Sequence, residues 1–208
     1  MNPTTQPAPA TRDSTLRHLA TSVLYTIVSV IVFGLIYPLA IWGIGTLLFH
    51  HQAEGSLIVE RNGALIGSEL VGQSWSKPRY FHGRPSAAGK GYDPTATGGT
   101  NLGPTSKKLI DATKAAIAAL KKENPDATEP IPIDLVTSSA SGIDPDISPA
   151  GAYYQVARVA KARGMSTGAV RTIVRAHVTR RQFGLLGEPR VNVLELNRAL
   201  DAQGAMPK

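Results

Sequence analysis

The sequence contains no cysteine, and only 6% of its residues are aromatic. Without cysteine, the chain has no disulfide framework, no cysteine-ligated zinc site and no thiol nucleophile. Charged residues make up 18% of the 208 residues, which is a low fraction for a soluble enzyme. No nucleophile and base stand at a recognisable spacing. Asp144 and Asp146, on either side of Pro145, predict an Asx-type turn rather than half of a metal site. We therefore predict no catalytic residue and no metal site.

The charge that is present is mostly positive. Lysine and arginine outnumber aspartate and glutamate by 22 to 15, which gives a net charge of +7. This balance suits an acidic partner, which is a nucleic acid, an anionic membrane surface or an acidic protein face. Composition alone does not choose among the three.

A long uncharged run near the N-terminus decides the class of protein. Residues 19–49, LATSVLYTIVSVIVFGLIYPLAIWGIGTLLF, contain no charged side chain. About 20 apolar residues are enough to cross a bilayer. The run is too long for a secretory signal peptide, and the HHQAEG that follows is a poor cleavage site. We predict a transmembrane anchor over residues 19–49, helical from roughly Val23 to Leu48.

The basic residues on either side of the run predict its orientation. Arg12 and Arg17 precede it, whereas Arg61 is the only lysine or arginine between His50 and Ala64. The positive-inside rule then places residues 1–18 in the cytoplasm, as a disordered tail, and residues 52–208 outside the membrane.

Four small or helix-breaking residues interrupt the predicted anchor, namely Gly34, Pro38, Gly43 and Gly45. Small residues let another helix approach closely, and proline kinks or loosens a helix. We expect these four residues to pack against helices of partner subunits. The alternative is that glycine and proline are simply more frequent in membrane helices than in soluble ones.

The segment after the anchor predicts a mixed α/β (α+β) soluble domain over residues 52–208. SLIVERNGALIGSELVG predicts a hairpin turning at Asn62-Gly63. A helix is expected from about Ser106 to Lys122, a strand in PIPIDLVT, helices in AYYQVARVAKARG and STGAVRTIVRAHVTRR, and a strand leading into a helix at the C-terminus.

A long loop rich in glycine, proline, serine and threonine separates the hairpin from the first of these helices. Loops of this length inside a domain are uncommon and are often functional, and aromatic residues argue that this one is ordered. We expect the loop from Trp75 to Gly103 to form an external contact surface. Its candidate contact residues are Trp75, Tyr80, Phe81 and Arg84.

Within this loop, ATGGTNLGPTSKKL is spaced like a phosphate-binding loop, because four residues separate Gly98 from Gly103. Pro104 stands where such a loop needs its lysine, and proline supplies neither the charge nor a backbone N–H. No strand is predicted before the loop. We interpret the stretch as a structural loop that leads into the helix starting near Ser106.

Residues 155–176 offer a competing interpretation. The order and spacing of the predicted elements are those of a helix-turn-helix: two short helices, a turn at Gly164 and a capping Ser166. The surrounding arginines, among them Arg158 and Arg171, supply the charge that contacts with phosphate need. A membrane-anchored DNA-binding regulator is therefore the alternative function. If the domain lies outside the membrane, it has no access to DNA, and no nucleic-acid partner is expected.

Four stretches carry a resemblance to a known family. They read GSELVGQSWSKPRYFHGRPSA, GGTNLGPTSKKL, PIDLVTSSASGIDPDISPAGAYYQVARVA and LGEPRVNVLELNRALD. In this order, and after a single N-terminal span, they resemble the C subunit of the Kdp potassium-transporting P-type ATPase. The resemblance covers most of the chain from Leu35 to Asp201.

This resemblance implies an accessory, non-catalytic subunit in the bacterial inner membrane. Its implied partners are a channel-like subunit that carries potassium, a P-type subunit that hydrolyses ATP, a small single-span subunit and membrane lipid. The chain would hold no cofactor of its own, because the complex handles ATP and potassium.

The family's C subunit is described as a catalytic chaperone that raises the ATP affinity of the hydrolysing subunit. Gly98, Gly99 and Asn101 are the candidate nucleotide contacts in that description. A domain outside the membrane has no access to cytoplasmic ATP. With the predicted orientation, the change in ATP affinity would therefore be transmitted by conformational changes of the membrane-spanning part.

Overall fold

The structure is a computed structural model that describes residues 14–60 and 63–203. The predicted tail falls largely on residues 1–13, outside the described residues. The described chain divides into two compact units, one ending at Glu54 and one beginning at Gly55, and each is considered by itself.

The first unit is one long apolar helix followed by a single short turn. Helix α1 (Thr15–Ser29), a π-helical stretch (Val30–Ile36) and helix α2 (Tyr37–Leu48) run on without a break, and α3 (His50–Ala53) follows. Within the 34 residues Thr15–Leu48, an 18-residue window reaches a mean hydropathy of 2.3, which fits a single membrane span. The helix starts earlier than predicted because Ser14 caps it, its Oγ accepting from the backbone N–H of Arg17.

The π-helical stretch has a cause in the sequence. Pro38 has no N–H to donate to the carbonyl of Gly34, so the regular ladder is interrupted there. The N–H of Tyr37 donates instead to the carbonyl of Val32, five residues back. Such wide turns are a known adjustment where a proline disturbs a helix.

The second unit begins with the predicted hairpin. Strands β1 (Leu57–Val59) and β2 (Leu65–Ser68) pair antiparallel, with Ile58 opposite Gly67 and Val59 opposite Leu65. This confirms the hairpin, while Asn62 of its expected turn lies outside the described residues.

A second sheet has three short antiparallel strands in the order β3 (Asp146–Ile147), β5 (Arg190–Asn192), β4 (Val178–Thr179). The predicted strand before the C-terminal helix is confirmed as β5. The strand predicted in PIPIDLVT is wrong, since the segment forms a 3-10 turn at Ile133–Leu135. Pro130 and Pro132 cannot donate to a ladder, and the carboxylate of Asp134 accepts from the backbone N–H and the hydroxyl of Ser148.

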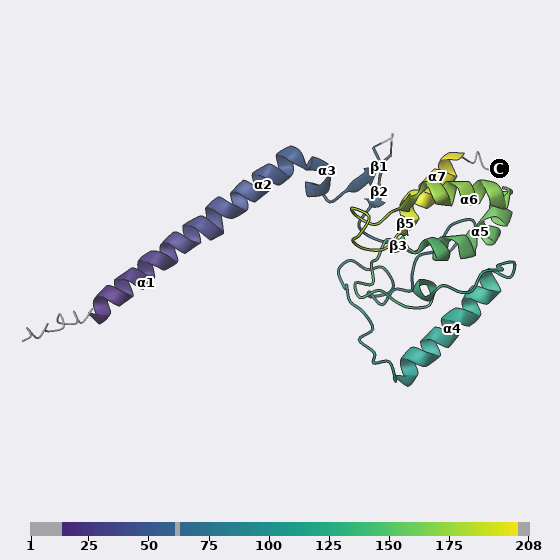
Figure 1. The fold of residues 1–208 in the computed structure, drawn as a ribbon, viewed down its shortest axis with the longest axis horizontal. Helices are drawn as coiled ribbons and strands as arrows, with labels where there is room; N and C mark the ends of the chain where they lie inside the picture. The colour runs from purple at the N-terminus through teal and green to yellow at the C-terminus, as the bar shows by residue number, and fades with distance from the viewer. Residues whose placement is uncertain (1–13, 61–62, 204–208) are drawn as a thin grey trace, which may run out of the picture. The chain divides into compact units, whose positions relative to one another are not determined.

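Three helices pack side by side and form the core, and the first and the last of them also contact β5 (Figure 1). They are α5 (Pro149–Arg163), α6 (Thr167–Ala176) and α7 (Val193–Gln203). Gly164 ends α5 in the left-handed conformation with φ of 65°, and Ser166 caps α6. The fully buried aliphatic side chains include Val156, Val159, Val170, Val174, Val191, Leu196 and Leu200.

Helix α4 (Lys107–Glu123) confirms the helix predicted from Ser106. It lies at the edge of the domain, drawn in teal in Figure 1, and none of its side chains is fully buried. Its C-terminal end meets the core through Leu120. Residues 69–106, between β2 and α4, contain the predicted contact loop.

Candidate partner-binding surface

Two buried amide side chains hold the backbone of the contact loop. The N–H of His82 donates to Oε1 of Gln155 over 2.8 Å, and Nε2 of Gln155 donates back to the carbonyl of His82 over 3.0 Å. Asn197 makes the same pair of bonds with Phe81, at 2.8 Å and 3.0 Å. Each amide therefore acts like one residue of a neighbouring β-strand, and the loop is fixed to both α5 and α7.

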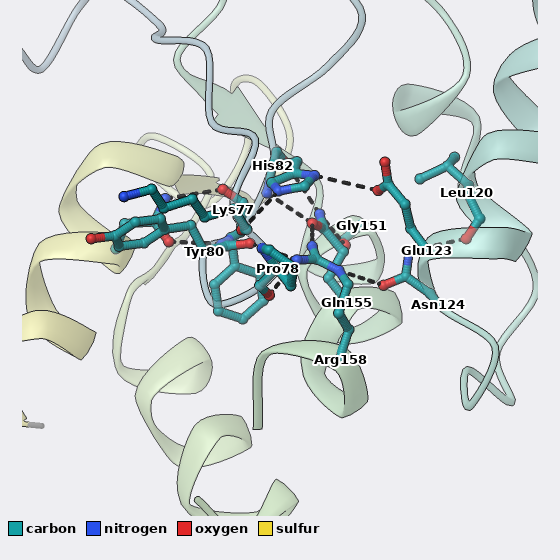
Figure 2. A network of polar contacts seen from close by, with 12 residues as sticks. Lys77, Pro78, Tyr80, His82, Leu120, Glu123, Asn124, Gly151, Gln155 and Arg158 are labelled. Carbon is teal, nitrogen blue, oxygen red and sulfur yellow. Dashed lines mark hydrogen bonds and ion pairs between the residues drawn. The ribbon is translucent and has the colours of Figure 1, made fainter. Parts of the chain in front are cut away.

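The guanidinium of Arg158 completes this network (Figure 2). It donates to the carbonyls of Pro78 and Tyr80, to Oδ1 of Asn124 over 3.0 Å and to Oε1 of Gln155 over 2.7 Å. Only 8% of Arg158 is exposed. Burial lowers the pKa of this guanidinium, an effect that the nearby carboxylate of Glu123 opposes. The guanidinium of Arg158 thus bonds at the same time to the loop, to α5 and to the C-terminal end of α4.

His82 faces α4 from the same loop. One ring nitrogen, Nδ1, lies 3.4 Å from Oε2 of Glu123, and the other lies 3.1 Å from the carbonyl of Lys77. Burial and then the charge of Arg158 lower the pKa of His82, while the Lys77 carbonyl and Glu123 act in the opposite direction. The imidazole is therefore held toward its neutral form inside a network that already carries one buried cation.

Trp75 and Tyr80, two of the predicted contact residues, touch each other. Their ring centroids are 4.7 Å apart at an interplanar angle of 55°. The guanidinium groups of Arg79 and Arg163 lie 5.1 Å and 5.2 Å from the centroid of the Tyr80 ring. The Tyr80 hydroxyl donates to Asp201 over 3.1 Å, so this aromatic pair is also fixed to α7.

The other two predicted contact residues differ in position. Phe81 was expected on the surface but is fully buried in the core, because Asn197 holds its backbone inward. Arg84 is a quarter exposed, and its Nη1 donates to Asp144 over 2.9 Å. The second carboxylate oxygen of Asp144 accepts from the N–H of Asp146, which confirms the predicted Asx turn.

Tyr92 fixes the middle of the loop. Its hydroxyl donates to the carbonyl of Arg84 over 2.6 Å, and burial raises its pKa to about 12. A Cβ on Gly72 would stand 2.5 Å from the Tyr92 ring, and one on Gly83 would stand 2.3 Å from its hydroxyl. Glycine at both positions is what lets this ring enter the loop.

A cleft of about 310 Å³ opens between the loop and α4. Its lining residues include Trp75, His82, Arg84, Tyr92, Leu120, Glu123 and Gln155. Two of them carry buried N–H groups, Nε1 of Trp75 and Nε of Arg84, that find no acceptor among the described residues. Buried donors are rarely left unpaired, so the wall of this cleft has two locally unsatisfied donors.

The candidate nucleotide contacts lie elsewhere. The N–H of Gly98 donates to the carbonyl of Ser141 over 2.8 Å, and Gly99 approaches the backbone of Ala140. Asn101 is exposed, with φ of 52°. None of these three residues lines the 310 Å³ cleft. Their described contacts are those of a loop packed against a neighbouring turn.

The four residues singled out in the anchor do not share one face. Gly34, Pro38 and Gly45 are spaced by four and seven residues and therefore fall on one side of the helix. Gly43 is five residues from Pro38 and points to a different side. A Cβ on Gly43 or Gly45 would have no neighbour within 4 Å in the described chain, so neither glycine is required for packing within this chain.

The basic residues of the predicted helix-turn-helix are largely engaged within the domain. Arg158 is buried in the network described above, and Arg163 bonds to Asp201 over 2.8 Å. Lys161 pairs with Asp126, and Arg171 pairs with Glu129. Side chains already paired in this way are poorly placed to contact phosphates, and the geometry does not favour a DNA-binding role.

No group of three or more histidine, aspartate or glutamate side chains that could hold a metal ion occurs in residues 14–60 or 63–203. Sequence reasoning missed Gln155 and Asn197, which organise the surface, and assigned Arg158 a different role. The available signal was a polar residue at an apolar position, because Gln155 and Asn197 lie on the buried faces of α5 and α7.

Comparison with known proteins gives consistent matches over almost the whole chain. Residues 19–202 match the profile of a family described as "KdpC: K+-transporting ATPase, c chain". A protein of Koribacter versatilis named "Potassium-transporting ATPase KdpC subunit" is 52% identical over 192 residues, covering 92% of this chain and 97% of its own length. A protein of the same name from Acidobacterium capsulatum is 55% identical over 186 residues, with coverage of 89% and 98%. The likeness includes both the apolar helix and the domain after it.

Proposed function

Because this chain belongs to the KdpC family, the c chain of K+-transporting ATPases, we propose that it acts as a non-catalytic accessory subunit of the transport complex. The match over residues 19–202 carries this proposal. The contact loop supports it, because the most buried polar side chains there bind the loop's backbone and do not converge on a reacting centre.

The proposed partners are a channel-like subunit that carries potassium, a P-type subunit that hydrolyses ATP and a small single-span subunit. The anchor would pack on them through the side that carries Gly34, Pro38 and Gly45. The domain would contact them through the cleft between the contact loop and α4, which is lined by Trp75 and Arg84.

The proposed location is the bacterial inner membrane, with the N-terminus in the cytoplasm and the domain outside. A raised ATP affinity of the hydrolysing subunit would then be transmitted through the membrane helices, as a coupling free energy between two distant sites. The packing of Gly98 and Gly99 against residues 139–142 supports a structural role for that loop rather than direct nucleotide contact.

Labelling of single cysteines tests the sidedness, and the chain has no native cysteine to interfere. Lys107 and Gln203 are suitable labelling positions because both are exposed. Positions such as Ser56 and Ser139 are unsuitable because they are buried. Lys107→Cys and Gln203→Cys should react with a membrane-impermeant thiol reagent in intact cells. Protection until the membrane is opened would refute the external location and restore direct nucleotide contact as an explanation.

Reconstitution tests the accessory role. The complex should be purified with and without this chain, and both forms should be assayed for potassium-stimulated ATP hydrolysis over a range of ATP concentrations. We expect the purified chain alone to hydrolyse no ATP and the complete complex to have a lower KM for ATP. ATP turnover by the isolated chain, or an unchanged KM and unchanged assembly without it, would contradict the proposal.

A further inference from the structure

The hairpin carries apolar side chains on a face that is exposed to solvent, where polar side chains are expected. A strand with one solvated face normally alternates apolar and polar residues. In β1 the inward residue, Ile58, is 6% exposed, yet its outward neighbours Leu57 and Val59 are also apolar, at 42% and 53% exposure. Leu65, paired with Val59 across the hairpin, is 62% exposed.

A second apolar group stands on the loop between β4 and β5. Phe183 is 88% exposed, Leu185 is 79% exposed and Leu186 is 59% exposed. The N–H of Gln182 donates to the carbonyl of Leu186 over 2.8 Å, which closes the loop into a tight turn. Three large apolar side chains are therefore presented together at the tip of one short loop.

The backbone of this loop is strained at Phe183. Its φ is 53°, a left-handed value that bulky residues adopt rarely and that asparagine or glycine would adopt at lower cost. The ring itself is almost fully exposed and gains little from packing within the domain. A strained and exposed aromatic residue indicates a role outside the domain's own stability.

The two groups lie on the same side of the domain. Nδ2 of Asn192, at the end of β5, donates to the carbonyl of Glu69, just after β2, over 2.8 Å. Leu70 and Thr179 line a common hollow between the hairpin and the sheet. In Figure 1 the yellow-green loop that enters β5 lies on the side of the domain where β1 and β2 are found.

Few residues separate the hairpin from the membrane helix. Only residues 49–56 separate α2 from β1, and His50–Ala53 within them are helical. Such a segment spans at most about 25 Å, whatever direction it takes. The start of the hairpin is therefore within about 25 Å of the end of α2, whichever way the domain is turned.

We propose that these two apolar groups, which we call the apolar edge, insert into the interface of the lipid bilayer. The apolar edge consists of Leu57, Val59, Leu65, Phe183, Leu185 and Leu186. Arg180 and Arg181 precede Phe183, and Arg181 is bonded to Glu188. Arginine beside exposed aromatic and aliphatic residues suits an anionic headgroup region, where the apolar tips enter the acyl boundary.

Quenching by brominated lipid tests this proposal on the full-length chain. Leu185→Cys and, as a control, Lys107→Cys on α4 each carry one environment-sensitive fluorophore. Both residues are exposed, so labelling leaves the core intact. Each protein is placed in vesicles of phosphatidylcholine and phosphatidylglycerol, with and without bromine on the acyl chains, alone and in the assembled complex.

We expect about a twofold loss of emission at position 185, because interfacial side chains lie about 5–10 Å into the boundary region, within reach of the bromines. Position 107 should lose almost none. Equal quenching at both positions would indicate non-specific adhesion and would overturn the proposal. Absence of quenching at 185 would also overturn it, and a blue shift at 185 only in the assembled complex would assign the apolar edge to a protein partner instead.

Discussion

Asn197 and Phe81 are paired as two residues of adjacent β-strands would be, although one is on a helix and the other is in a loop. Oδ1 of Asn197 accepts from the N–H of Phe81, and Nδ2 donates to its carbonyl. Both residues are fully buried. The pairing lets an irregular loop enter the core without leaving backbone groups unsatisfied.

Removal of this amide should destabilise the domain strongly. Asn197→Leu keeps the size of the side chain but leaves the N–H and the carbonyl of Phe81 buried without partners. We expect the free energy of unfolding to fall by about 2–4 kcal/mol. Urea denaturation measures it, with Trp75 as the single tryptophan reporter after Trp42→Phe. Gln203→Leu on the exposed end of α7 is the control, and an equal effect from both changes would show that the pairing contributes nothing.

Arg158→Lys should destabilise the domain nearly as much as Arg158→Met, although lysine keeps the positive charge. A single ammonium group cannot reach the carbonyls of Pro78 and Tyr80 together with Asn124 and Gln155. We expect a loss of about 3 kcal/mol, equivalent to a decrease in Tm of about 6–12 °C for a domain of this size. Thermal unfolding measures it, with exposed Arg175→Lys as the control. Full stability of Arg158→Lys would show that the charge, not the fork, is what matters.

The stability of the domain should decrease below pH 6.5, partly because of His82. Its folded pKa is lower than the ordinary value of 6.5, so the unfolded chain binds the proton more tightly than the folded chain. The penalty is therefore absent above pH 6.5 and grows as the pH falls from there toward the folded pKa, by up to about 1.4 kcal/mol per pH unit.

Paired measurements at pH 7.5 and pH 5.5 check this sign. His82→Gln retains an N–H donor for the carbonyl of Lys77 but does not titrate. The loss of stability between the two pH values should be smaller for His82→Gln than for the unmodified chain. A larger loss in His82→Gln would mean that contact with Glu123 outweighs burial.

A large side chain should impair assembly with the partner subunits when it is placed on one side of the anchor helix, and not when it is placed on the other. Gly45 shares a side of the helix with Pro38 and Gly34, so Gly45→Leu should hold a neighbouring helix away. We expect co-purification of the partner subunits to fall about tenfold, which corresponds to about 1.4 kcal/mol. Gly43→Leu adds the same volume on a different side and serves as the matched control. If the two variants assemble equally well, the side with Pro38 is not the packing surface.

The elements that sequence reasoning predicted correctly are those set by local signals. The apolar run identified the long helix, alternation about Asn62-Gly63 identified the hairpin, and Gly164 with Ser166 marked the boundary between α5 and α6. Each of these signals acts within a few residues along the chain, where the backbone preferences of single residues decide the conformation.

What sequence reasoning missed depends on residues far apart in the chain. Arg158 was interpreted as a phosphate contact and Phe81 as a surface aromatic, yet both are buried where the loop crosses α5 and α7. Pro130–Thr137 alternates like a strand, but Asp134 binds the start of α5 instead. Neither the alternation nor the charge of a residue shows which distant backbone it will meet.

The length of the N-terminal helix sets a condition on the membrane around it. A helix of 34 residues is about 51 Å long, whereas the hydrocarbon region of a bilayer is about 30 Å thick. Such a mismatch is relieved by tilt, by local thickening of the lipid or by neighbouring proteins that cover the surplus apolar turns. A subunit with so long an apolar helix is therefore better accommodated among other membrane subunits than alone in lipid. Its steady-state amount in the cell should depend on how much of the rest of the complex is present.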